Sequence, residues 1–243
     1  MRLVILVLCV ARCFDGAMHV DHEEARSVFL DQLDAFLDVC GQLRDSDCVA
    51  ASRCRGWTVG DVLVHVHLGL QEMLLGVVSR SDLAPDADAA SYWLREVPSS
   101  DVDADALAGV RFVRLLGAAY RRPCGVVGHM RPTALGVATA VRSLAPGALQ
   151  FQGHVLATGD FLATWAVELA VHQLDLGREL CIARPSTAAI DLTIATIESI
   201  LGIGMPATWS PEFRILAGTG RVSLSEEQMS ESGPVAGLLP ALG

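Results

Sequence analysis

The chain has 243 residues, 51% of them hydrophobic, and a formal net charge of −10. That length is sufficient for one large domain, or for one domain with a small extension. The composition excludes a disordered chain, since disorder requires low hydrophobicity and high charge. Lys and Arg supply most of the non-specific affinity for phosphates, and acidic residues outnumber them 28 to 18. We therefore expect neither a nucleic acid nor an anionic membrane as a partner.

The N-terminal segment and the cysteines bear on the cellular compartment. The apolar run from Leu3 to Ala11 matches the core of a signal peptide but is far shorter than the ~20 residues of a membrane span. No clear cleavage site follows it, so residues 1–20 are expected to be a leader or a misassigned start, with Met18 as the alternative start. The seven cysteines include no C-x-x-C pair and match neither a disulfide framework nor a thiolate zinc site. We expect a cytoplasmic protein; a secreted one is the alternative.

Helical periodicity predicts the elements of the first half of the chain. Apolar residues three and four apart predict a helix over residues 21–43. A capping box at Thr58 and Asp61 predicts a second helix that ends near residue 79. The acidic stretch 80–105 has no sustained period and is interpreted mostly as a solvated connection, followed by a third helix over 101–120.

The second half begins with a glycine-rich stretch, residues 124–158, which is interpreted as irregular with a short helix near 133–143. Asp160 is expected to cap a long helix that ends near residue 180. Another helix is predicted over residues 186–201. The pair Ser210-Pro211, a cap followed by proline, predicts the start of a further helix.

Strand-like alternation is nearly absent, so the fold class is predicted to be mostly α. Four long helices with one long crossover after the second predict a four-helix bundle over residues 21–184. Residues 185–243 are expected to form a small C-terminal extension, α or α+β in structure.

Two of the predicted helices carry titratable residues that could meet in the bundle core. Glu168 and His172 are four residues apart and project from one helix face. His65 lies among apolar residues on what should be a buried helix face. A pair of His residues with one Glu is a zinc ligand set that leaves a coordination position open. From spacing alone, a solvated Glu–His pair and an ordinary core histidine remain alternatives.

Three sequence motifs resemble a known family. Residues 56–65, GWTVGDVLVH, resemble the "GWT-V-x-D-L-x-x-H" signature of the maleylpyruvate isomerase N-terminal family, the mycothiol-dependent branch of the DinB-like metal-binding bundles. Residues 158–175 resemble its "E-x-x-x-H-x-x-D" helix, and residues 217–221 its C-terminal "TGR". The resemblance implies a DinB-like four-helix bundle that binds a divalent metal, usually zinc, through His65, Glu168 and His172.

The resemblance also implies an activity. The family uses mycothiol as co-substrate, and a zinc-bound thiol is deprotonated to the nucleophilic thiolate. The implied function is a transferase or isomerase that activates mycothiol as a zinc thiolate for attack on a small electrophile, in a monomer or homodimer. Arg221 matches an arginine linked to activity and could clamp a carboxylate, while Asp61 or Asp175 could orient a ligand imidazole.

Two other functions remain open from the sequence. A metal-dependent hydrolase on the same bundle would acidify a bound water, and a non-catalytic helical binding protein would need no chemistry at all. The segments 80–105 and 124–158 match no family motif and are expected to shape the substrate pocket. Lys and Asn, both with A/T-rich codons, are missing, which is typical of GC-rich genomes and fits the actinobacteria that use mycothiol.

Overall fold

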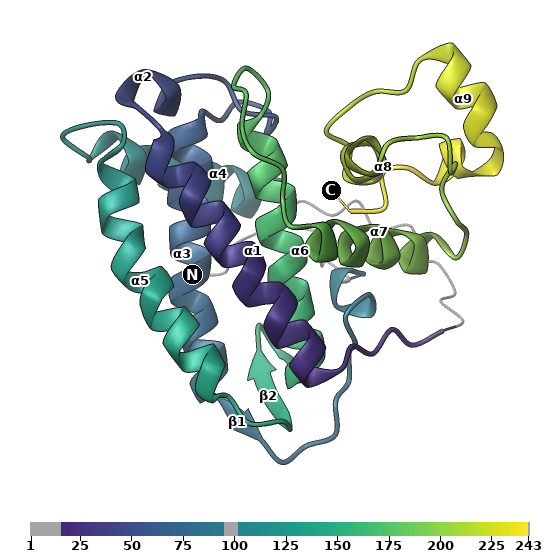
Figure 1. Cartoon of the computed structure of the whole chain (residues 1–243), viewed down its shortest axis with the longest axis horizontal. Helices are drawn as coiled ribbons and strands as arrows, with labels where there is room; N and C mark the ends of the chain where they lie inside the picture. The colour runs from purple at the N-terminus through teal and green to yellow at the C-terminus, as the bar shows by residue number, and fades with distance from the viewer. Residues whose placement is uncertain (1–15, 95–101, 243) are drawn as a thin grey trace.

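The structure, a computed structural model, describes residues 16–94 and 102–242, and it is mostly α-helical as predicted (Figure 1). Four long helices form a bundle in which α1 packs on α5 and α6, and α3 packs on the same two helices. Their bounds are α1 His22–Gln42, α3 Val59–Val78, α5 Gly125–Ser143 and α6 Thr158–Leu176.

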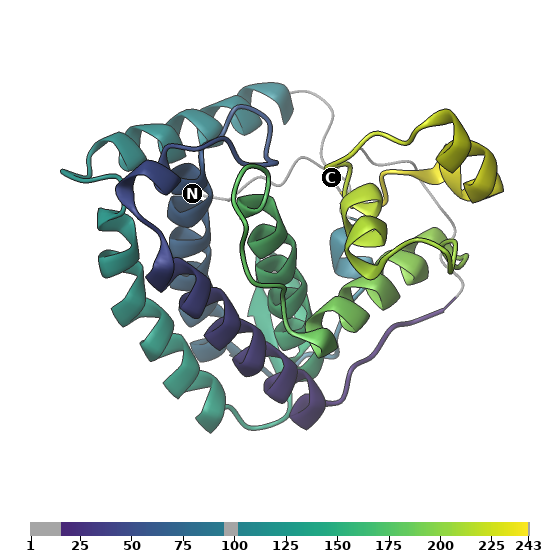
Figure 2. The same ribbon diagram turned by 45° about the horizontal axis from the view of Figure 1, so that its top comes forward.

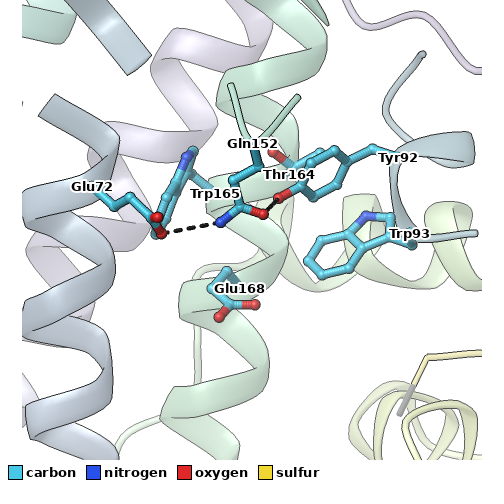
Figure 3. A pocket seen from close by; sticks show the side chains of 7 residues that line it. All are labelled: Glu72, Tyr92, Trp93, Gln152, Thr164, Trp165 and Glu168. Carbon is cyan, nitrogen blue, oxygen red and sulfur yellow. Dashed lines mark hydrogen bonds between the residues drawn. The ribbon is translucent and has the colours of Figure 1, made fainter. Parts of the chain in front are cut away.

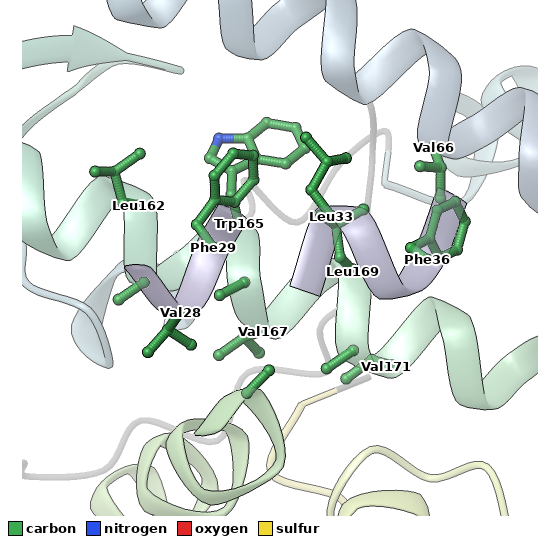
Figure 4. Close-up of a cluster of buried hydrophobic side chains, with 14 of the residues drawn as sticks. Val28, Phe29, Leu33, Phe36, Val66, Leu162, Trp165, Val167, Leu169 and Val171 are labelled. Atoms are coloured by element: carbon green, nitrogen blue, oxygen red, sulfur yellow. The ribbon is translucent and has the colours of Figure 1, made fainter. Parts of the chain in front are cut away.

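The bundle core is built from residues that recur every three or four positions. On α1, Phe29, Leu33 and Phe36 are fully buried and face α6 (Figure 4). On α6, Trp165 and Leu169 are buried in the same cluster. Large apolar side chains at helical spacing stabilise the bundle because each removes much of its surface from water.

The starts of α1 and α3 are as the sequence predicts. Asp21 accepts the backbone N–H groups of Glu23 and Glu24. Thr58 and Asp61 form the predicted capping box, in which each side chain accepts the other residue's backbone N–H. These contacts satisfy N–H groups that have no partner inside the helix.

The predicted bundle helix over 101–120 exists as α4 (Val102–Ala118), but it lies outside the bundle and packs on α3 (Figure 2). The fourth bundle helix is α5, which contains the short helix predicted near 133–143 but begins at Gly125, so the interpretation of its first part as irregular was wrong. Pro132 and three glycines within α5 obscured its pattern. The buried face outweighs the helix-breaking cost of the proline and comprises Val126, Met130, Ala134, Val137, Ala138 and Val141.

A small antiparallel sheet closes one end of the bundle, and two of its strands lie in the stretch 124–158 that was expected to be irregular. Its strand order is β1-β2-β3, with β1 Arg80–Ser81, β2 Ala148–Phe151 and β3 His154–Ala157. Gln152 and Gly153 join β2 to β3 with φ values of 49° and 89°. Two positive φ angles are what a tight two-residue hairpin turn requires.

Part of the stretch expected to be a solvated connection is buried. Asp88 is buried and accepts the N–H groups of Ala90 and Ser91 at the start of the short 3-10 helix η1 (Ser91–Trp93). Tyr92 and Trp93 on η1 join the core. Residues 95–101 of the predicted connection lie outside the described residues.

The start of α6 differs from the prediction. The helix begins at Thr158, and Asp160 does not cap it. The Asp160 carboxylate instead accepts the backbone N–H of Val20 at 2.8 Å and lies 2.9 Å from His19 Nδ1. These contacts attach the segment before α1, within the expected leader, to the bundle. The helix ends at Leu176, four residues before the predicted end.

The regular secondary structure of the C-terminal extension, in its described part, consists of helices joined by loops. The helix predicted over 186–201 is α7 (Thr187–Leu201), with Ser186 as its cap. Ser210 caps α8 (Pro211–Gly218), as predicted. α7 packs on α6, and α8 packs on α7 and α6, so the extension lies to one side of the bundle (Figure 1). Further along are α9 (Glu226–Ser232) and the 3-10 helix η2 (Gly233–Leu238).

Among the described helices, α3 is long and apolar enough to cross a membrane by length and composition. Its most apolar window is 61% buried within the protein, and its neighbours are the other bundle helices. This burial is typical of a core helix in a helical bundle.

Candidate metal centre

Three predicted ligand residues from two helices meet in the bundle. His65 Nε2 on α3 lies 3.3 Å from Glu168 Oε1 on α6, and His172 Nε2 lies 3.2 Å from the same oxygen. Both imidazoles are buried, and their ring centroids are 4.7 Å apart. The three side chains offer donor atoms that all lie within 4.8 Å of one another.

This arrangement fits a tetrahedral divalent metal. Two donor atoms held at about 2.0–2.1 Å by one tetrahedral zinc ion lie about 3.3 Å apart. The two nitrogen–oxygen distances, 3.3 and 3.2 Å, match that separation. Two imidazoles and one carboxylate also form a ligand set typical of a zinc site with an open fourth position.

The electrostatics of the centre favour a charged Glu168. Burial alone would raise the pKa of Glu168, but the neighbouring His172 and His65 hold that pKa well below its usual range. Burial lowers the pKa of His65. Burial has the same effect on His172, but Glu168 and Asp175 outweigh it and raise the pKa of His172 well above its usual value. Glu168 and Asp175 thus stabilise a positive charge at His172, and a bound cation would take the place of the proton on His172 Nε2.

Asp175 holds the other side of the His172 ring. Its Oδ2 lies 3.0 Å from His172 Nδ1, and Asp175 is fully buried. A carboxylate at Nδ1 fixes the ring so that Nε2 is free to bind a metal. Burial raises the pKa of Asp175, but Arg221 and His172 more than offset this and lower it to about 2. The structure thus supplies the geometry for the orienting role that the sequence suggested for Asp175.

Arg221 lies behind Asp175, away from the three candidate ligands. Its Nε donates to Asp175 Oδ1 at 3.3 Å, and its Nη1 donates to the carbonyl of Thr219 at 2.7 Å. Cys54 also donates to Asp175 Oδ2, at 3.1 Å. The carboxylate that Arg221 binds here belongs to the protein, so the clamp on a substrate carboxylate stays a prediction.

The remaining sequence candidates lie in other surroundings. Asp61 accepts hydrogen bonds from the backbone N–H and the hydroxyl of Thr58 in the capping box at the start of α3, and the orienting role suggested for it stays a prediction. Trp57 packs on His65 with ring centroids 5.2 Å apart. His67 Nε2 lies 3.1 Å from Thr133 Oγ1 on α5, outside the centre.

A shallow pocket that is half open to solvent lies next to the centre, with about 330 Å³ of empty space when the open solvent at its mouth is included, and Glu168 is part of its wall (Figure 3). Tyr92, Trp93 and Trp165 form aromatic walls. Three hydrogen-bonded polar side chains complete the pocket wall. Tyr92 Oη donates to Gln152 Oε1 at 3.0 Å, and Gln152 Nε2 donates to Glu72 at 3.0 Å. Within the described structure, the indole N–H groups of Trp93 and Trp165 are buried without a partner.

The sequence held some signal for these pocket residues. Glu72 lies seven positions, or two helical turns, after His65, and Trp165 lies three before Glu168. Helical spacing could have placed both on the faces that carry the ligands. Tyr92, Trp93 and Gln152 come from the two stretches without a family motif. The pocket position of these three depends on tertiary packing that no local pattern encodes.

Comparison with known proteins gives one family. The model described as "Mycothiol maleylpyruvate isomerase N-terminal domain" matches residues 29–177, more than half of the chain. That range contains the whole bundle except the first turns of α1, and all three candidate ligands. No curated protein and no solved structure gives a significant match.

Proposed function

Because the chain belongs to the mycothiol maleylpyruvate isomerase N-terminal domain family, we propose that it is a metal- and mycothiol-dependent transferase or isomerase. Its substrate is a small electrophile that the thiol attacks. A transferase would release a stable S-conjugate of the two, whereas an isomerase would release the rearranged substrate and return the thiol. The observation that carries the proposal is the convergence of His65, Glu168 and His172 beside a pocket.

The residues of the centre have distinct roles in this proposal. His65 and His172 bind the metal through Nε2, and Glu168 binds it through its carboxylate. A bound divalent metal lowers the pKa of a thiol and so supplies a nucleophile at neutral pH. Asp175 accepts a hydrogen bond from the Nδ1–H of His172 and so keeps Nε2 directed at the metal. Arg221 and Cys54 position Asp175 through their hydrogen bonds to its carboxylate.

The pocket supports a small organic substrate. Its aromatic walls provide apolar surface, and Glu72 and Gln152 provide polar groups that fix orientation.

The test is turnover of thiol by the zinc-loaded protein. We expect incubation with mycothiol and a panel of activated alkenes to give S-conjugates or isomers by mass spectrometry. Glu168→Ala should lose this activity, whereas His67→Ala, on α3 near the ligand His65 but outside the centre, should keep it. Products from the zinc-loaded wild type that do not depend on mycothiol would contradict the proposal.

A hydrolase is a second candidate because of Glu72. Glu168 is assigned to the metal, so a hydrolase needs another carboxylate as general base, and Glu72 lies on the wall of the same pocket. Glu72 is bound by Gln152 at 3.0 Å, which occupies one of its oxygens. Hydrolysis of esters or amides without thiol, lost in Glu72→Gln, would favour this function.

A further inference from the structure

Two cysteines far apart in sequence bring their sulfur atoms together at the end of the bundle opposite the sheet. Cys48 Sγ, at the end of α2 (Asp45–Cys48), lies 2.7 Å from Cys124 Sγ, just before α5. Ordinary contacts between non-bonded heavy atoms are about 3.5–4.0 Å, and the sulfur–sulfur bond of a disulfide is about 2.04 Å. The side chains therefore already point at each other, and little movement separates them from a bond.

Neighbouring contacts fix this approach. The backbone N–H of Cys124 donates to Asp45 Oδ1 at 3.0 Å. The Arg122 guanidinium donates to the other carboxylate oxygen of Asp45 at 2.9 Å. Asp45 is in the same short helix as Cys48, so both ends of the sulfur contact are attached to one framework. The contact is thus a product of the fold rather than of two free side chains.

We propose that Cys48 and Cys124 form a redox-dependent intrachain disulfide whose oxidant is a low-molecular-weight disulfide. Cys48 is buried, whereas Cys124 is partly exposed, so an external disulfide meets Cys124 first. In a reducing compartment the pair stays as two thiols, and the bond forms when small disulfides accumulate. The proposal is independent of the function proposed for the metal centre.

The disulfide would form by thiol–disulfide exchange in two steps. The Cys124 thiolate attacks one sulfur of the small disulfide, whose S–S bond breaks, and the first small thiolate leaves. The Cys48 thiolate then attacks Cys124 Sγ, the mixed disulfide breaks, and the second small thiolate leaves. The two protons of the cysteines end on the two released thiols. The cysteine pair loses two electrons, and the small disulfide gains them.

The surroundings make this a slow reaction. Burial raises the pKa of the Cys48 thiol. Burial, followed by the Asp45 carboxylate, raises the pKa of the Cys124 thiol despite the hydrogen bond from Cys48. Little of either thiol is therefore ionised at neutral pH, and the thiolate is the attacking form. The pair responds to sustained oxidation rather than acting as a fast catalyst.

The bond would anchor the start of α3, the helix that carries His65. The Cys48 carbonyl lies against Gly60 in the first turn of α3, where an added Cβ would come within 3.0 Å of it. The N–H of Val59 also donates to the carbonyl of Ala50, two residues after Cys48. A Cys48–Cys124 bond would therefore join α2 covalently to the start of α5, and the start of α3 packs on this linked pair through non-covalent contacts.

The experiment uses the full-length protein, zinc-loaded, and the neutral disulfide of β-mercaptoethanol as probe. After alkylation of free thiols, trypsin should yield the peptide 45–53 joined to the peptide 122–142, with both unlinked peptides lost. Dithiothreitol should restore both peptides. Cys181→Ser, which removes an exposed free cysteine, should give the same joined peptide, and Cys124→Ser should not.

Three results would overturn the proposal. These are full alkylation of both cysteines after oxidation, a β-mercaptoethanol adduct that persists on Cys124, and a bond from either cysteine to another partner such as Cys40. The wild-type peptide map distinguishes these results even if Cys124→Ser does not fold.

Discussion

Both ring nitrogens of His172 contact a carboxylate, and these contacts allow several polar side chains to be buried together in the bundle core. Its Nε2 faces Glu168 and its Nδ1 faces Asp175, which in turn binds Arg221 and Cys54. Buried charges are costly unless they are paired and hydrogen-bonded. The spacing of His65, Glu168 and His172 was visible in the sequence. The Arg221–Asp175 contact joins residues 46 positions apart, and no local pattern could predict it.

Replacement of Asp175 by Asn tests the orienting role. The amide keeps the shape but loses the negative charge that holds the His172 Nδ1–H, and Arg221 loses its ion pair. We expect the affinity for zinc to fall about 10–100-fold, as measured by competition with a chromogenic chelator. Asp160→Asn, a buried carboxylate on the same helix but away from the centre, is the matched control. An unchanged zinc affinity in Asp175→Asn would show that Asp175 does not act on the metal.

His19 gives a pH-dependent prediction outside the metal centre. Its hydrogen bond to the Asp160 carboxylate, supported by the charge of that carboxylate, raises the pKa of His19. A raised folded-state pKa means that the contribution of His19 to stability is fully present below about pH 6.5, the unfolded pKa. It is lost as the pH rises through the folded-state pKa.

NMR titration of the His19 ring measures this shift. We expect a midpoint above that of an unperturbed histidine in the wild type, and a return toward the ordinary value in Asp160→Asn. His19 is mostly exposed, so added salt should weaken the shift by screening. Equal midpoints in the wild type and in Asp160→Asn would refute the pairing.

At the scale of elements, the sequence predicted helices better than their places in the fold. α1, α3, α4, α7 and α8 were predicted near their observed positions, because apolar periodicity and capping residues are local signals. The choice of α5 rather than α4 as a bundle member was not predicted. It depends on which apolar face meets α1 and α3, and that is a property of packing across the whole chain.

Gly159 tests the close approach between the start of α6 and the segment before α1. A Cβ at this position would lie 2.1 Å from the carbonyl oxygen of Val20, which is backbone and cannot rotate away. We expect Gly159→Ala to lower the free energy of unfolding by about 1–3 kcal/mol, measured by urea titration.

Gly128 on α5 provides the matched control, because an added Cβ there meets no atom within 4 Å. Gly128→Ala should be neutral or stabilise the helix by up to ~1 kcal/mol, since Ala is the better helix former. Equal effects of the two substitutions would mean that the approach of α6 to Val20 is not as close as described.

At the scale of the whole molecule, the C-terminal extension contributes to the centre. Arg221 follows α8 and reaches Asp175 on α6. Gln32 on α1 also joins the bundle to the start of the extension, since its Oε1 accepts the N–H of Ser186. The domain boundary near residue 185, predicted from the sequence, is therefore crossed by buried contacts.

We expect the bundle and the extension to unfold together. Ile197 on α7 is fully buried, and its side chain lies against Gly218 on α8. Ile197→Ala should leave a single unfolding transition and lower the free energy of unfolding by about 2–5 kcal/mol. Leu75→Ala, on an exposed face, should change that free energy little. Circular dichroism and tryptophan fluorescence should give the same midpoint. Two separate transitions, with Ile197→Ala affecting one of them, would show independent domains.

The central claim is that His65, Glu168 and His172 bind one divalent metal. The most direct measurement is the zinc content of dialysed protein by mass spectrometry, together with zinc affinity by titration. The account predicts one zinc per wild-type chain and per His67→Ala chain, and a loss of zinc from both His65→Ala and Glu168→Ala. Undiminished zinc in folded His65→Ala and Glu168→Ala would contradict it.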